Sequence, residues 1–100
     1  MANFKNTRYV TKGISNEIPL HLQLILWDLI DTMEVEEKDY LQVFKLSQED
    51  HKQKVTHIQE EPEYEKIHFF HRIPDTPIVT TKIFIIDDET HSTMLLSNEY

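Results

Sequence analysis

The sequence contains no cysteine, and its only glycine is Gly13. Without cysteine the chain can form no disulfide, no thiolate nucleophile and no zinc site with sulfur ligands. A single glycine cannot build the glycine-rich backbone of a phosphate-binding loop. No serine lies in the glycine-flanked turn that presents the nucleophile of many hydrolases. Because the usual catalytic motifs are missing, we expect that the protein is not an enzyme.

Basic residues are also scarce, since ten Lys and Arg stand against 18 Asp and Glu and give a formal net charge of -8. This charge repels phosphate backbones, so we expect no nucleic-acid partner. Long apolar runs are missing too, because His21, Gln23 and Asp28 interrupt the most apolar segment, which is too short to cross a bilayer. The opening residues, MANFKNTRYVTKG, lack the apolar stretch of a signal peptide. We therefore expect a cytoplasmic protein without membrane association.

One helix is predicted over residues 17–34 of a single domain that spans residues 1–100. Ser15 or Asn16 can cap this helix, and Pro19 is suited to its first turn. Leucines at alternating positions from 20 to 26 are also compatible with a strand. The apolar spacing nevertheless continues to Met33, over a length that is more typical of a helix.

Strands account for most of the remaining chain, with 80–88 expected at the centre of the sheet; the predicted strands are 8–13, 40–46, 54–61, 64–72 and 80–88. Residues 47–51 are predicted as a connection and the proline-containing 73–79 as a loop, while residues 90–100 stay unassigned. These elements predict an α+β fold. In it, one long helix packs across one face of a roughly five-stranded, mainly antiparallel sheet.

The predicted helix carries apolar residues on two sides. At 100° per residue, seven of them share the face expected to cover the sheet: Ile18, Leu22, Ile25, Leu26, Leu29, Ile30 and Met33. Leu20, Leu24 and Trp27 lie on the opposite side, where either the 90–100 tail, the 73–79 loop or a partner could cover them. We expect a partner interface there, because tryptophan is a frequent interface anchor, and a second copy of the chain is the simplest partner.

Two histidines suggest an alternative hypothesis, in which the protein is a metal- or small-ligand-binding module. If Ile58 faces the core and opposes Ile67, His57 lies opposite His68 on the other face of the sheet. Two imidazoles can begin a metal site, but the spacing fixes no third ligand, so we expect no cofactor and treat both as surface histidines. Carboxylate pairs at 36–37, 60–61 and 87–88 are interpreted as solvated turns and strand ends that do not form a cleft.

Several segments resemble a family of small uncharacterised proteins from staphylococci and related Gram-positive bacteria, known as a domain of unknown function. The similarity covers RYVTKGI, EIPLHLQLILWDLID, DYLQVFKL, TKIFIIDD and STMLLSNEY. Its most specific parts are IPLHLQLILW and DYLQVFKL. The resemblance implies a cytoplasmic bacterial protein of this size, and it brings no catalytic residue, cofactor or substrate. The leading hypothesis from the sequence is therefore a non-enzymatic interaction or regulatory module.

Overall fold

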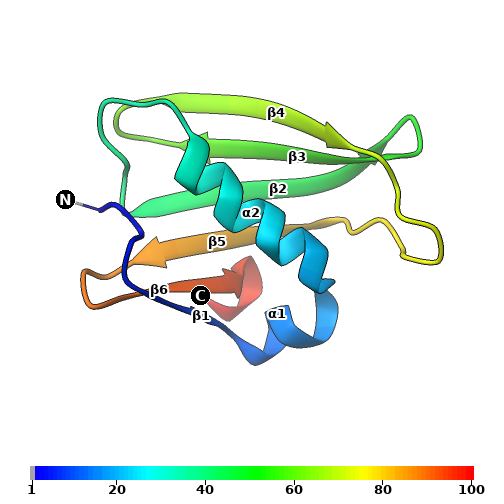
Figure 1. The fold of residues 1–100 in the computed structure, drawn as a ribbon, viewed down its shortest axis with the longest axis horizontal. Helices are drawn as coiled ribbons and strands as arrows, with labels where there is room; N and C mark the ends of the chain where they lie inside the picture. The colour runs from blue at the N-terminus through cyan, green and yellow to red at the C-terminus, as the bar shows by residue number, and fades with distance from the viewer. Residues whose placement is uncertain (1) are drawn as a thin grey trace.

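The computed structural model describes residues 2–100. A six-stranded sheet has the order β1-β6-β5-β2-β3-β4. Its strands are β1 (Thr7–Val10), β2 (Leu41–Glu49), β3 (Lys52–Gln59), β4 (Tyr64–Phe70), β5 (Thr81–Asp87) and β6 (His91–Leu96). The helices are α1 (Lys12–Glu17), α2 (Leu20–Thr32) and the short 3₁₀ helix η1 (Ser97–Glu99). Figure 1 shows α2 lying across one face of this sheet.

The α+β class is confirmed, but the detailed arrangement differs from the prediction. The sheet has a sixth strand and is mixed, because β1 pairs in parallel with β6 while the other neighbours are antiparallel. That sixth strand is the previously unassigned tail, which fills the position between β1 and β5. The strand predicted at 80–88 does lie at the centre, beside β2.

The predicted single helix is in fact two helices, divided at Pro19. Thr11 caps α1, since its side-chain oxygen accepts a hydrogen bond from the Ile14 N–H. Ile18 then adopts an extended conformation, as residues before proline prefer, and Pro19 becomes the N-cap of α2. The prediction placed Pro19 inside the first turn and therefore missed both the break and α1. It was right that residues 20–32 form a helix and not a strand.

The predicted inner face of the helix is confirmed for most of its residues. Ile18, Leu22, Leu26 and Ile30 are buried, Met33 is at the edge of the core, and Ile25 and Leu29 are half-buried. They pack with inward residues of the sheet and with Phe4 and Ile14: Phe44, Leu46, Val55, Ile83, Ile85 and Met94. The core thus lies on the helix-covered face, and both α-helices contribute to it.

Two connections agree only partly with the prediction. β2 extends to Glu49, so the predicted 47–51 connection shrinks to the two residues Asp50 and His51, both with positive φ. Residues 73–79 form the expected loop. The buried amide of Gln53 holds the end of that loop, accepting from the Val79 N–H at 2.9 Å and donating to the Val79 carbonyl at 3.0 Å.

Among residues 2–100, no helix combines the length and apolar character that a membrane-spanning segment needs.

Candidate interaction surfaces

The outer side of α2 is only partly exposed. Leu20 and Leu24 expose 67% and 59% of their surface, whereas Trp27 exposes only 8%. Arg8 of β1 covers the indole, with its guanidinium carbon 4.7 Å from the ring centroid. The expectation that Trp27 lies uncovered beside the two leucines is therefore wrong. Its cover comes from β1, which the sequence analysis had not considered, and the exposed part of the stripe is Leu20 and Leu24.

The two histidines proposed as weak ligands lie on the helix-covered face of the sheet, not on its outer face. β3 and β4 pair two residues out of the predicted register, so that His57 faces Lys66 and His68 faces Val55. Ile58, which was expected in the core, points to the other face and opposes Glu65. The structure thus places both imidazoles on neighbouring strands but buries His57 completely.

His57 belongs to a buried polar network. Its ring stacks on Phe44 with centroids 4.3 Å apart, and its Nε2 lies 2.6 Å from Oε1 of Gln42. Since an amide oxygen can only accept, Nε2 carries the proton and Nδ1 is the atom left without a hydrogen-bond partner. Burial, with a smaller contribution from His68, lowers the pKa of His57 to about 4. His57 is therefore a neutral core residue, and the interpretation as a surface histidine is wrong.

Two glutamines extend this network to the chain before β2. Gln42 donates to Oε1 of Gln59 at 2.7 Å and to the Asp39 carbonyl at 2.9 Å. Gln59 in turn donates to the carbonyls of Glu37 and Pro62. These bonds commit Gln42 and Gln59 to structural contacts. Among residues 2–100, no three His, Asp or Glu side chains are arranged to bind a metal ion.

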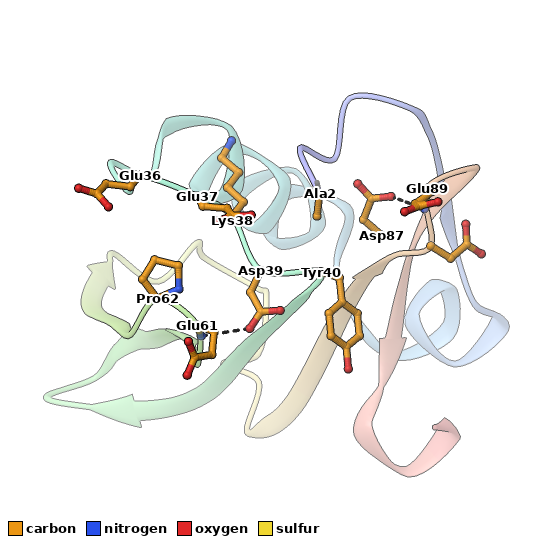
Figure 2. Close-up of a pocket in the computed structure, with 11 residues that line it drawn as sticks. Ala2, Glu36, Glu37, Lys38, Asp39, Tyr40, Glu61, Pro62, Asp87 and Glu89 are labelled. Carbon is orange, nitrogen blue, oxygen red and sulfur yellow. Dashed lines mark hydrogen bonds between the residues drawn. The ribbon is translucent and has the colours of Figure 1, made fainter.

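Members of all three acidic pairs line a cleft, contrary to the interpretation as separate solvated turns. They meet in an open pocket of about 920 Å³ at one end of the sheet (Figure 2). Its lining includes Glu36, Glu37, Lys38, Asp39, Glu61, Asp87, Asp88 and Glu89. Asp39 accepts from the Glu61 N–H and Asp87 from the Glu89 N–H, as Figure 2 shows. These carboxylates therefore have structural roles in fixing the turns around the pocket.

The opposite face of the sheet was missed by the sequence analysis. Residues that alternate with the buried positions of β2, β3, β5 and β6 point away from α1 and α2. Six apolar residues share this side and form what we call the open-face patch: Leu41, Val43, Ile58, Phe84, Ile86 and Leu95. Leu95 is buried and the other five are half-buried. The signal in the sequence was the presence of apolar residues on both faces of 40–46 and 80–88.

Strand register makes the open-face patch continuous. Val43 lies between Ile58 of β3 and Phe84 of β5, and Phe84 is followed by Leu95 of β6. Leu41 and Ile86 form the next cross-strand pair. Tyr100 borders the patch, with its ring 5.6 Å from that of Phe84.

The family model described as staphylococcal protein of unknown function (DUF960) matches residues 7–99. The chain belongs to this family. The resemblance seen in the sequence is thereby confirmed. The fold is also similar to the crystal structure of a protein of unknown function from Enterococcus faecalis, with a TM-score of 0.82 and 26% identity. That similarity covers 100% of this chain and 97% of the other. No curated protein shows significant similarity to this member of the family.

Proposed function

We propose that this protein is a non-enzymatic, cytoplasmic interaction module whose partner is a second copy of itself. The observation that carries the proposal is the open-face patch, which lies on the side of the sheet away from α1 and α2. Contiguous apolar surface of this kind is typical of protein interfaces. Because two sheets can pack face to face about 10 Å apart, a second sheet is a natural cover for it.

The size of the sheet supports a stable contact. The molecule measures 39 × 27 × 21 Å, and the view down its shortest axis looks onto the sheet (Figure 1). A standard interface buries about 800 Å² on each partner. The two longer dimensions therefore leave room for an interface of ordinary size. Ile67 and Phe69 of β4, each 47% exposed, add apolar surface beside the patch.

Leu20 and Leu24 offer the competing contact, which the sequence analysis proposed. With Trp27 buried, this surface consists of two leucines on one helix. Burying an apolar side chain of this size contributes ~1.5–3 kcal/mol, whereas association costs ~4–15 kcal/mol. The open-face patch has three times as many apolar side chains in one continuous area, so we favour it as the contact.

Sedimentation of three proteins at micromolar concentration tests the proposal. We expect the wild type to be a dimer, Val43→Glu to be a folded monomer, and Leu24→Glu to remain a dimer. Circular dichroism melts of each variant check that the fold is kept, and Ile58→Lys serves as a second patch variant if Val43→Glu unfolds. A monomeric wild type would refute self-association. A monomer caused by Leu24→Glu alone would place the contact on α2 instead.

A further inference from the structure

The two central strands carry the same arrangement of charges on the open face. Along β5 and the residue after it, the positions on this face are Lys82, Phe84, Ile86 and Asp88. Along β2 they are Lys45, Val43 and Leu41, and Asp39 precedes Leu41 by two residues. Each strand therefore has a lysine at one end, two apolar residues in the middle and an aspartate at the other end.

Antiparallel pairing brings like ends together. Lys45 lies directly opposite Lys82, and beyond the apolar pairs the Asp87 N–H donates to the Tyr40 carbonyl at 2.9 Å, so Asp39 and Asp88 follow at the same end of the two strands. Like charges directly opposite each other destabilise a sheet. Within one copy, each of these pairs therefore brings two like charges together, whereas an oppositely charged partner would stabilise them.

The centre of this pattern is a single residue pair. The midpoint between Lys82 and Asp88 is residue 85, and the midpoint between Asp39 and Lys45 is residue 42. Gln42 and Ile85 are partners in the register of β2 and β5. A two-fold axis can pass over this pair, parallel to the sheet and perpendicular to its strands. Rotation about this axis places each strand of one copy over the same strand of the second copy. The two strands run in opposite directions, so the lysine end of one lies over the aspartate end of the other.

We infer that two copies pack open face to open face about this axis, with Lys82 opposite Asp88 and Lys45 opposite Asp39 of the second copy. This inference rests on the proposed self-association and adds its geometry. The same axis places Phe84 over Ile86 and Val43 over Leu41, so that apolar residues meet apolar residues.

The distances suit these ion pairs. Each charged position lies three residues from the axis, or about 10 Å along the strand. Packed sheets are rotated by about 30°, which displaces groups at that radius by about 5 Å, within reach of a lysine side chain. Lys82 already lies on this face, with its Nζ 5.5 Å from the centroid of Phe84. The Asp88 carboxylate is half exposed and is anchored by the Thr90 and His91 N–H groups.

Crosslinking tests the geometry without depending on the energy of the ion pairs. The chain has no cysteine, so Lys82→Cys and Asp88→Cys each give one reactive thiol. A short bismaleimide can bridge the ~10 Å between packed sheets. We expect an equimolar mixture of the two variants to form crosslinked dimers and Lys82→Cys alone to form none, because residues 82 of the two copies lie about 20 Å apart across the axis. Lys54→Cys mixed with Asp88→Cys is the matched control, and it should stay uncrosslinked.

Charge reversal provides the second measurement. Lys82→Asp should weaken dimerisation about tenfold or more in sedimentation, and adding Asp88→Lys should restore most of the loss, since the reversed charges meet again between copies. A dimer that crosslinks 82 to 82, or that neither crosslinks 82 to 88 nor responds to the reversed pair, overturns this arrangement while self-association stands. A monomeric wild type overturns both.

Discussion

The guanidinium of Arg8 lies above the ring of Trp27, 4.7 Å from its centroid, and is held there by Asp31, whose Oδ1 is 2.6 Å from Nη2. Arg8 also donates from Nε and Nη2 to the Phe4 carbonyl. One arginine therefore joins β1, the N-terminal segment and α2. This contact explains how a tryptophan on the side of the helix away from the sheet can belong to the core of a small two-layer domain.

Trp27→Ala should destabilise the fold by ~3–5 kcal/mol, because it removes a large buried ring and leaves Arg8 without the surface that it covers. Urea unfolding measures the change. Leu24→Ala, on the same side of the same helix but 59% exposed, is the matched control and should change stability by no more than ~0.5 kcal/mol. Equal, small effects of the two substitutions would contradict the burial of Trp27.

His57 should make stability depend on pH between about 6.5 and 4. Its pKa falls from 6.5 to about 4 in the folded protein, so the unfolded chain binds a proton more readily throughout this range. The stabilisation is present above pH 6.5 and is lost as the pH falls toward 4, by up to ~3 kcal/mol. Urea melts at half-unit pH steps would measure the loss.

The variant His57→Phe isolates this contribution from the titration of the many carboxyl groups. Phenylalanine fits between Phe44 and Tyr64 but leaves Oε1 of Gln42 without its donor, which costs ~1–3 kcal/mol at pH 7. Since the variant cannot bind the proton, its stability and that of the wild type should converge between pH 6.5 and 4. A constant difference across that range would show that His57 titrates normally in the folded state.

β3 shows where hydrophobic alternation predicts the wrong face. Its inward residues include Gln53, His57 and Gln59, whereas Ile58 faces outward. Hydrophobicity alone orients Ile58 toward the core, and the predicted pairing with β4 was also wrong, by two residues. The inward polar residues are acceptable because hydrogen bonds satisfy them. Those bonds connect residues far apart in the chain, so the sequence could not indicate them.

Local patterns predicted the elements better than their arrangement. The predictions were correct for the helix over 20–32, for the central strand at 80–88 and for the two-proline loop. The ends of the helices and the pairing of the strands were harder to predict. Pro19 could be a first-turn residue or a cap. The tail HSTMLL becomes a strand only because β1 and β5 flank it. The charged pattern of the open face is visible in the sequence, but it has meaning only once Gln42 is known to pair with Ile85.

Substitutions in the β2–β3 turn should stabilise the folded protein. Asp50 and His51 both have positive φ, 52° and 61°, which is the geometry of a two-residue type I′ turn. Asparagine followed by glycine is preferred in such turns, because glycine adopts positive φ more readily than histidine does. The double substitution Asp50→Asn with His51→Gly should raise the unfolding free energy by about 0.5–1 kcal/mol in urea melts. The reverse control, His51→Val, should lower it.

Asp87 should govern a second, more acidic pH range. Burial alone raises the pKa of its carboxyl, but hydrogen bonds from the N–H groups of Glu89 and Phe4, from the Asn6 amide and from the Asn3 N–H outweigh burial and hold the pKa below its usual 3.8. The stabilisation is therefore present above pH 3.8 and is lost as the pH falls through the lower folded value.

Asp87→Asn should cost ~1–3 kcal/mol at pH 7, because an amide nitrogen cannot accept from the N-terminal segment that holds Phe4 in the core. It should also flatten the loss of stability below pH 3.8 while leaving the loss between 6.5 and 4 unchanged. Asp75→Asn, in the exposed 73–79 loop, is the matched control and should alter neither range. If Asp87→Asn and Asp75→Asn gave the same acid unfolding curve, the carboxyl of Asp87 would not be what anchors the N-terminal segment.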